Sequence, residues 1–387
     1  MRDPFLDERH ARLRERARAL SLAKLEPLEE RAESDLREAS RQAVRAMGDE
    51  GLFRAVVPEA HGGDAAQVEV RAVAAAREGV AYGSPLADAL LALQGLGSLP
   101  ISFAGAEEQK RAWLPKVAQG RAIAGFALTE PGAGSDVAAM RTRATRVGDE
   151  WELTGEKTFI SNAGLADFYT LFAKTDPDAG HRGISAFLVP ADGGGLSHRP
   201  LKLLANHPIG TLTLERARLP RSALLGAEGD GFKLALRTLD RMRSTVAAAA
   251  CGMAWRALDE AVSRARSREQ FGKPIGENQG LRWMLADAST QLEAARLLTY
   301  RAAWLADGGQ ERVTVESAQA KLFATETAQR VVDLALQVHG GAGTLHGSVV
   351  ERLYREVRAL RIYEGTSEVL RETIGKALLR DAAETPR

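Results

Sequence analysis

The sequence FALTEPGAGSD, residues 126–136, stands where the chain changes from a helical to a strand-rich texture. Its two glycines raise the question of a phosphate-binding loop. A Walker loop would end in Gly-Lys-Ser or Gly-Lys-Thr, and this stretch contains no lysine. A dinucleotide-binding fingerprint would need a third glycine at Val137 and a βαβ unit after it. Taken alone, the stretch is as consistent with a plain turn between strands as with a binding loop.

The chain before this stretch is rich in Ala, Leu, Glu and Arg. Apolar residues recur there at three- and four-residue spacing, as in Leu13, Ala17 and Leu20. This spacing predicts amphipathic helices. Glycine and proline predict turns at residues 58–64 and 95–100.

The chain after the stretch alternates between apolar and polar residues, as at residues 151–154 and 211–215. Such alternation predicts strands, and the sequence VGDE at residues 147–150 predicts a hairpin turn between two of them. Helical texture returns after about residue 232. Long runs without proline there predict helices over residues 244–266, 281–306 and 313–338, with breaks at residues 272–280 and 340–347.

The predicted fold is therefore mainly α with a central β domain. We expect an N-terminal helical domain over residues 1–121 and a middle antiparallel β-barrel-like domain over residues 122–232. A C-terminal four-helix bundle is expected over residues 233–387.

Composition excludes several classes of protein. Lys plus Arg is 52 and Asp plus Glu is 51, which argues against a dedicated nucleic-acid binder. The single cysteine, Cys251, allows no intrachain disulfide and no cysteine-rich zinc site, and its alanine-rich surroundings predict a small buried residue. We expect no metal site, because the histidines and the cysteine show no ligand spacing. We also expect no membrane span, because no apolar stretch approaches the roughly 18 residues required. Residues 1–30 contain acidic residues as well as Arg, unlike a transit peptide, so we expect a cytoplasmic location.

Further motifs follow residues 126–136 in order. They are FISNAG at residues 159–164, REQFGKPI at residues 268–275 with Gln279, QVHGG at residues 337–341, and IYEGTS at residues 362–367. Together, these blocks resemble the signatures of the acyl-CoA dehydrogenase family, and the resemblance covers essentially the whole chain.

The resemblance implies FAD bound in an extended form between the β domain and the C-terminal bundle. Hydroxyl and backbone donors suit the polar edge of the flavin, because reduced flavin carries extra electron density. Ser161 is expected near flavin N5 and Phe159 beside the ring. The other expected contacts in this part of the chain are Phe126, Leu128, Thr129, Gly134 and Ser135.

A second group is expected to reach the FAD of a neighbouring subunit. Arginine makes forked bonds to phosphate, and glycine lets backbone N–H groups approach it. Arg268 alone would be an ordinary charge at a helix end. The group is Arg268, Phe271, Gln279, Gln337, Gly340 and Gly341, with Thr366, Ser367 and Glu368 as further FAD contacts. The resemblance thus implies at least a dimer and usually a homotetramer.

Glu364 matches the catalytic base of the family, which removes the α-proton of an acyl thioester while the β-hydrogen leaves as hydride to flavin N5. Without context, a glutamate between tyrosine and glycine would be a solvated loop residue. One family branch places its base on the long helix after the β domain, and the matching residue here, Met242, cannot accept a proton. The backbone N–H of Glu364 and a ribityl hydroxyl of FAD are expected to polarise the thioester carbonyl.

Substrate contacts follow from the same resemblance. Tyr363 and Gly365 would line the acyl channel, and Ser135, Asp240 and Arg243 would hold the CoA moiety. Residues 203–210 depart from the family pattern, which leaves the substrate open. Small residues within Ala89 to Leu96, namely Ala89 and Ala92, leave room for a medium or bulky acyl chain.

The expected activity is fatty-acid-type acyl-CoA dehydrogenation, with an electron-transfer flavoprotein as acceptor. Alternatives are the same reaction on a carrier-protein thioester, or an oxidase or flavin monooxygenase of this fold. From a different class, a DNA-associated or non-catalytic flavoprotein stays open.

Overall fold

The structure is a computed structural model that describes residues 4–310 and 312–384. Contacts within the chain divide it into two compact units. The bundle unit comprises Met1–Glu30, Val70–Asp88 and Arg243–Arg387. The sheet unit comprises Arg31–Glu69 and Ala89–Met242.

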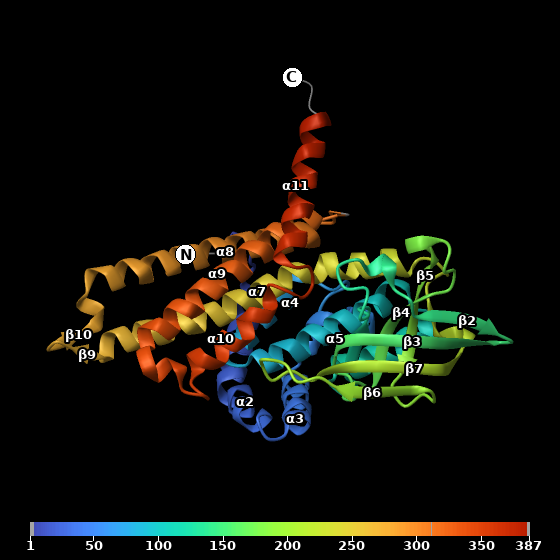
Figure 1. The fold of residues 1–387 in the computed structure, drawn as a ribbon, viewed down its shortest axis with the longest axis horizontal. Coiled ribbons are helices and arrows are strands. Elements are labelled where there is room, and N and C mark those ends of the chain that lie inside the picture. Colours follow the sequence, from blue (N-terminus) through green and yellow to red (C-terminus); the bar gives the residue numbers. More distant parts are fainter. Residues whose placement is uncertain (1–3, 311, 385–387) are drawn as a thin grey trace. The chain divides into compact units, whose positions relative to one another are not determined.

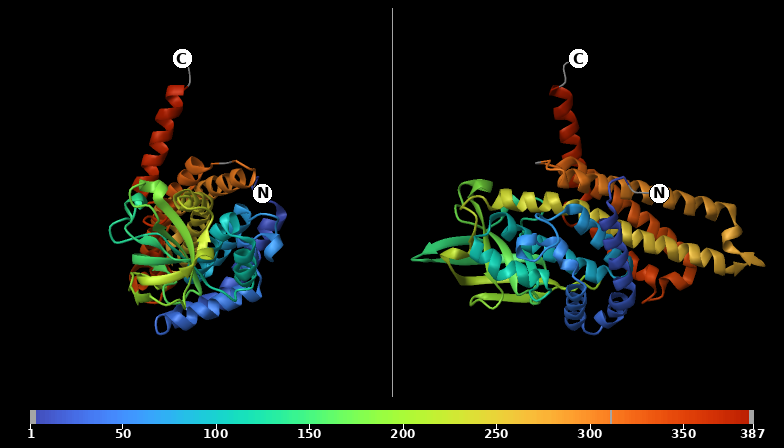
Figure 2. Two further views of the ribbon diagram at one scale, coloured as in Figure 1. Left: turned by 90° about the vertical axis from the view of Figure 1, so that its right-hand side faces the viewer. Right: turned by 180° about the vertical axis from the view of Figure 1, so that it is seen from behind.

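The bundle unit is built almost wholly from helices, and Figure 1 shows α8, α9 and α10 running alongside one another. The long helices expected from the sequence are confirmed within α7, α8 and α9. Its elements are α1 (Glu8–Leu20), η1 (Ser21–Leu25), α2 (Glu26–Ala32), α4 (Val70–Gly83), α7 (Gly231–Ser267, from Arg243 on), β9 (Glu269–Gln270), β10 (Lys273–Pro274), η7 (Ile275–Glu277), α8 (Gln279–Asp307), α9 (Thr314–His339), η8 (Gly340–Thr344), α10 (Val349–Leu360) and α11 (Ser367–Glu384). In both views of Figure 2, α11 extends away from the other helices of this unit.

The core of the bundle unit is rich in alanine. Ala247, Ala254 and Ala261 line the buried face of α7, and Cys251 lies among them as predicted. Alanine combines high helix propensity with a small side chain, so neighbouring helices can approach closely. Gly252 shows how close this approach is, because a Cβ atom there would lie 2.2 Å from the carbonyl oxygen of Glu78.

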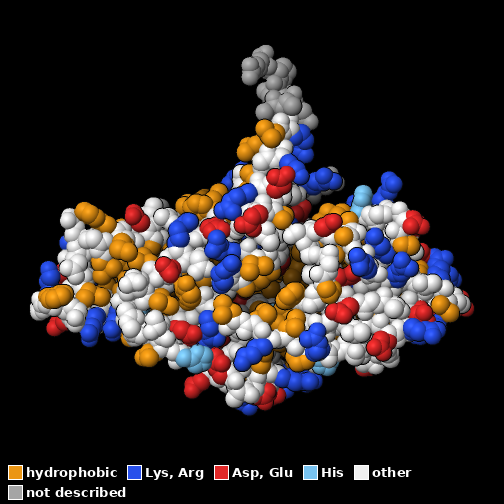
Figure 3. Space-filling view, viewed as in Figure 1, with side chains coloured by type: hydrophobic (Ala, Val, Ile, Leu, Met, Phe, Trp, Pro, Cys, Tyr) orange, Lys and Arg blue, Asp and Glu red, His pale blue; other side chains and the backbone are white. Residues whose placement is uncertain are grey.

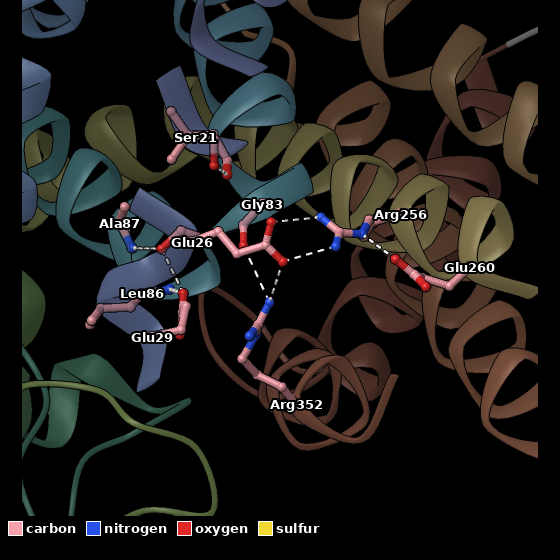
Figure 4. Close-up of polar contacts among 11 residues, drawn as sticks. Ser21, Glu26, Glu29, Gly83, Leu86, Ala87, Arg256, Glu260 and Arg352 are labelled. Carbon is pink, nitrogen blue, oxygen red and sulfur yellow. Dashed lines mark hydrogen bonds and ion pairs between the residues drawn. The ribbon is translucent and has the colours of Figure 1, made fainter. Parts of the chain in front are cut away.

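A polar network ties α2 to α7 and α10 within the bundle unit (Figure 4). The guanidinium of Arg256 forms a forked pair with the Glu26 carboxylate, at 2.8 and 3.1 Å, and Arg352 donates to the same carboxylate at 3.2 Å. Nearby, Glu29 accepts from the Ser84 hydroxyl at 2.6 Å, and burial raises the pKa of Glu29. Such pairs help to hold the helices in place, since removing one partner leaves a partly buried charge unpaired.

The sheet unit carries helices beside a sheet, whose strands β2, β3, β4, β6 and β7 lie side by side in Figure 1. Its elements are α3 (Leu36–Asp49), η2 (Leu52–Val56), η3 (Glu59–His61), α5 (Pro85–Ala104, from Ala89 on), α6 (Glu107–Ala118), β1 (Ala124–Ala127), η4 (Val137–Ala139), β2 (Arg143–Val147), β3 (Glu150–Ser161), β4 (Phe168–Lys174), η5 (Gly180–Gly183), β5 (Ile184–Pro190), β6 (Leu196–Pro200), β7 (Ile209–Pro220), η6 (Arg221–Ala223) and β8 (Leu224–Leu225).

The fold class is confirmed, with two corrections to the sheet. The strand order β6-β7-β3-β2-β4-β5-β8 ends at β6 and β8, and no pairing among the described residues joins these ends into a barrel. The sheet is also mixed rather than antiparallel, because β1 and β2 both pair with β4 in parallel. The predicted hairpin is confirmed: Val147 pairs with Glu150, and Gly148 has a φ of 60°, as the tight turn requires.

The turn predicted at residues 95–100 was wrong, because α5 runs through it. The glycines there permit close packing instead: a Cβ atom on Gly97 would lie 2.6 Å from Ala124 Cβ. The same helix corrects a second expectation, since it is long and apolar enough to span a membrane, with a mean hydropathy of 1.4. Of that window, 83% is buried inside the protein, as in a core helix.

Candidate active site

The loop between α10 and α11 places Glu364 in an unusual backbone conformation. Glu364 has a φ of 51° and Gly365 has a φ of 99°, so consecutive residues lie in the left-handed region. A non-glycine residue held there costs on the order of 1–3 kcal/mol, and the surrounding structure must offset it. Strain of this kind gathers at functional sites.

Glu364 also has uncommitted hydrogen-bonding groups. Its Oε2 atom is buried and has no hydrogen-bond partner among the described residues. Its backbone N–H likewise donates to no group in the part of the chain that the structure describes. One residue therefore offers a proton acceptor and a hydrogen-bond donor together.

The surroundings of Glu364 balance burial against positive charge. Burial raises the pKa of its carboxyl above the ordinary 4.5, while Arg77, Arg243 and Lys321 lower it and Asp88 raises it further. A carboxylate with a raised pKa is a stronger base at neutral pH.

Arg77 and Asp88 form a buried pair within the bundle unit. Arg77 donates twice to the Asp88 carboxylate, at 2.8 Å each, and once to the Thr245 hydroxyl at 2.9 Å. Both charged side chains are almost fully buried, with 1% and 2% of their surface exposed. Their positions are fixed, so the field that they create at Glu364 is fixed as well.

The ends of the Glu364 loop are anchored to α9 through Glu326. Ser367 donates its hydroxyl to Glu326 at 2.7 Å, and Arg361 donates to the same carboxylate at 3.0 Å. Arg243, expected at the CoA moiety, donates from Nε to the carbonyl oxygen of Glu364 at 3.3 Å. Loop closure thus depends on charged groups from both α7 and α9.

In the sheet unit, residues 126–130 lie against residues 157–161. The backbone N–H of Thr158 donates to the carbonyl oxygen of Thr129 at 2.9 Å. Lys157, which is fully buried, donates to the Leu128 carbonyl oxygen at 3.1 Å and pairs with Glu130 at 2.8 Å. Burial lowers the pKa of Lys157 to about 8, while Glu130 opposes that shift. Two motifs far apart in sequence are thereby joined.

The segment at residues 203–210, which departs from the family pattern, supplies a hydrogen-bond partner for Ser161. The Nε2 atom of His207 lies 2.7 Å from the Ser161 hydroxyl oxygen. Burial lowers the pKa of His207 to about 4, so its ring is neutral at pH 7. Phe159 beside them has a φ of 54° and leaves 59% of its surface exposed.

Most of the remaining predicted cofactor residues lie at exposed positions, but Thr366 is partly buried and Ser367 is buried. Gly134 and Ser135 are in the exposed loop after β1, and no atom lies within 4 Å of a Cβ atom placed on Gly134. In the bundle unit, Arg268, Phe271 and Gln279 surround the β9–β10 hairpin, with Phe271 fully exposed. The others lie near helix ends: Gln337, Gly340 and Gly341 at the end of α9, and Thr366, Ser367 and Glu368 at the start of α11.

Each unit, taken by itself, offers groups that suit part of a flavin nucleotide. An exposed aromatic ring at Phe159 and the hydroxyl of Ser161 suit a flat ring with a polar edge. The glycines at 134 and 341 leave open backbone for phosphate oxygens, since no atom lies within 4 Å of a Cβ atom at either position. Within the described residues, no group of three or more His, Cys, Asp or Glu side chains is arranged to hold a metal ion.

Comparison with protein-family models shows to which family the chain belongs. Residues 7–121, 125–217 and 229–379 match the models of the acyl-CoA dehydrogenase N-terminal, middle and C-terminal domains. The chain belongs to the acyl-CoA dehydrogenase family. As a member of this family, it is a flavoprotein oxidoreductase.

Individual relatives agree with this assignment. A probable acyl-CoA dehydrogenase of Mycobacterium leprae is 39% identical over 97% of this chain and 96% of its own length. A glutaryl-CoA dehydrogenase solved with glutaryl-CoA has a TM-score of 0.92 and 34% identity, over 97% of this chain and 96% of that one. A structure described as the electron transferring flavoprotein of Acidaminococcus fermentans has a TM-score of 0.91 and 35% identity, over 97% and 99% of the two chains.

Several residues that shape the site were not predicted from the sequence. Arg77, Asp88 and Lys321 read as ordinary helical charges, because their burial depends on helices distant in sequence. For Lys321 a signal exists, since alanines at 318, 320 and 324 place it within an apolar stretch of α9. His207 was noticed only as part of an altered segment.

Proposed function

We propose that the protein dehydrogenates an acyl-CoA thioester across Cα and Cβ to give the trans-2-enoyl-CoA. The observation that carries this proposal concerns Glu364 in a member of the acyl-CoA dehydrogenase family: within residues 4–310 and 312–384, neither its buried Oε2 atom nor its backbone N–H has a hydrogen-bond partner.

Glu364 acts as the base. Its carboxylate takes the α-proton, and general base catalysis of this kind contributes about 100- to 10,000-fold in rate. The raised pKa of Glu364 brings its basicity closer to neutral pH, which favours the transfer. Its backbone N–H donates to the thioester oxygen as negative charge develops there. One such donor contributes about 100- to 1000-fold.

The cofactor in this proposal is FAD. When bound, FAD supplies an acceptor for the hydride that leaves Cβ. Thr129, Phe159 and Ser161 hold the flavin ring, and the hydrogen bond to His207 fixes the Ser161 hydroxyl. Arg268 and the glycines at 340 and 341 hold the pyrophosphate of a neighbouring subunit's FAD, which makes the active form a homo-oligomer.

The proposed partners follow from the chemistry. Ser135 and Asp240 of the sheet unit contact CoA, and Tyr363 and Gly365 contact the acyl chain. An electron-transfer flavoprotein takes the electrons, in line with the similar structure from Acidaminococcus fermentans. A cytoplasmic location stays a prediction.

Anaerobic titration of the yellow protein with acyl-CoA thioesters tests the proposal. The panel contains butyryl-, octanoyl-, palmitoyl-, isovaleryl- and glutaryl-CoA, each with the matching carrier-protein thioester as a control. We expect at least one acyl-CoA to bleach the flavin absorbance and to yield enoyl-CoA. A flavin that stays oxidised with every CoA thioester contradicts the proposal. Bleaching by carrier-protein thioesters alone would show that the substrate is carried by a protein rather than by CoA.

A further inference from the structure

Lys321 is a buried lysine of α9 in the bundle unit, and its ammonium group touches the Glu364 loop on both sides of the base. It donates to the carbonyl oxygen of Tyr363 at 3.0 Å and to that of Gly365 at 2.7 Å. None of the residue's surface is exposed.

The carbonyl between these two is held by another cation. Arg243 donates from Nε to the Glu364 carbonyl oxygen at 3.3 Å, and its NH1 group lies 3.4 Å from the Ser317 hydroxyl. Ser317 and Lys321 lie four residues apart, on one face of α9. Three successive carbonyl groups therefore accept hydrogen bonds from two cations.

We propose that Lys321 is a positioning residue for the base: by binding the carbonyl oxygens of Tyr363 and Gly365, it holds Glu364 in the left-handed conformation that aims its carboxylate at the substrate. This role rests on the proposed function, because it concerns the orientation of the base in that reaction.

Two physical arguments support this role. Charge-assisted hydrogen bonds are about twice as strong as neutral ones, so Lys321 can offset the backbone strain at Glu364. Its positive charge is also one of three that lower the pKa of the Glu364 carboxyl against the effect of burial. Burial lowers the pKa of Lys321 to about 8, which reflects the cost of placing an ammonium group there, and the two carbonyl groups of the loop receive its hydrogen bonds.

The test uses Lys321→Met, which keeps the length of the side chain but removes its donors and charge. Flavin-loaded protein is incubated anaerobically with butyryl-CoA, or with the panel member that bleaches the flavin best, in D₂O. The α C–H bond breaks, the proton passes to Glu364, and a deuteron from solvent replaces it. Mass spectrometry of the recovered thioester therefore reports abstraction of the α-proton.

We expect exchange in Lys321→Met to be about 100-fold slower, because a misplacement of about 1 Å has an effect of that order. The KM for the thioester should change by less than about threefold, since the side chain touches the loop and not the substrate. The amide of Lys321→Gln can donate to one carbonyl group, so its exchange rate should lie between those of wild type and Lys321→Met. This variant serves as the test if Lys321→Met does not fold.

Arg256→Met is the matched control, because it removes another mostly buried cation of the bundle unit that does not contact residues 361–367. Arg256→Met should be less stable than wild type, but its folded fraction should exchange the α-proton at the wild-type rate. Exchange at the wild-type rate in folded Lys321→Met or Lys321→Gln overturns the role of Lys321 alone. A wild-type protein that neither exchanges nor is reduced overturns the proposed function, and this role with it.

Discussion

Glu364 pairs a strained backbone with a carboxyl group that burial makes harder to ionise. Neighbouring cations offset part of the effect of that burial through their charge, while Lys321 and Arg243 donate to backbone carbonyl groups and Arg77 donates to Asp88. The residue is thus held by its backbone, and its side chain is left for chemistry. Such an arrangement is expected to reduce stability where it serves function.

Replacing Glu364 by glutamine should therefore stabilise the protein at neutral pH. The pKa of Glu364 is raised in the folded state, so its full contribution to stability is present below about pH 4.5 and is lost as the pH rises through the folded pKa. Denaturant unfolding of Glu364→Gln and wild type at pH 7.5 and pH 4 measures this effect. A gain at pH 7.5 that shrinks at pH 4 is expected, with Glu372→Gln, an exposed change, as control; a loss at pH 7.5 contradicts it.

Arg77→Met should be strongly destabilising, by about 3–5 kcal/mol, because Asp88 is left buried without its cation. Arg54→Met is the control, since Arg54 pairs with Asp64 at 2.7 Å while about half of each side chain is exposed. We expect that control to change the free energy of unfolding by about 1 kcal/mol or less. Equal effects of the two variants would show that burial of the Arg77 pair has no energetic weight.

Among the elements, α5 shows where local sequence signals mislead. Glycine and proline at residues 95–100 predicted a turn, yet tertiary contacts keep the helix continuous. Gly97 is required by the close approach of Ala124 and Gly125, which a sequence read locally does not reveal. By contrast, the long helices α7, α8 and α9 were predicted well, because their periodic pattern extends over many turns.

Two glycines in helices should respond in opposite directions to alanine. Gly97→Ala places a Cβ atom 2.6 Å from Ala124 Cβ and 2.9 Å from the Gly125 carbonyl oxygen, so we expect a loss of about 1–3 kcal/mol. Gly375→Ala in α11 meets no atom within 4 Å and should gain up to about 1 kcal/mol through helix propensity. Thermal unfolding measures both, and a stabilised Gly97→Ala variant would contradict the packing described for α5.

At the scale of the whole molecule, the sequence predicted the family, the helical and β regions and the motif blocks. It did not predict the open, mixed sheet, because strand pairing depends on contacts across the fold rather than on alternation within a strand. Nor did it identify Lys321 or Arg77, whose roles come from burial between helices. The assignments of FAD and CoA contacts stay predictions, since they depend on bound groups.

Exposed apolar side chains on the bundle unit support the proposed homo-oligomer. Phe271, Trp283, Leu378 and Leu379 expose between 62% and 100% of their surface, and Figure 3 shows hydrophobic side chains gathered over the helices of this unit. We expect light scattering to give a multiple of the mass of one chain. Changing Leu378 and Leu379 together to Glu should weaken the assembly, whereas Val147→Glu on the β2–β3 hairpin should not; a monomeric wild type contradicts this prediction.

The most direct test of the central claim is the rate of flavin reduction in Glu364→Gln, followed anaerobically in a stopped-flow instrument. The acyl-CoA is the one that bleaches the wild-type protein fastest, and the flavin content of both proteins is matched first. Glu364→Gln should retain its flavin and be reduced about 100- to 10,000-fold more slowly than wild type. Reduction of the flavin-loaded variant at the wild-type rate would contradict the assignment of Glu364 as the base.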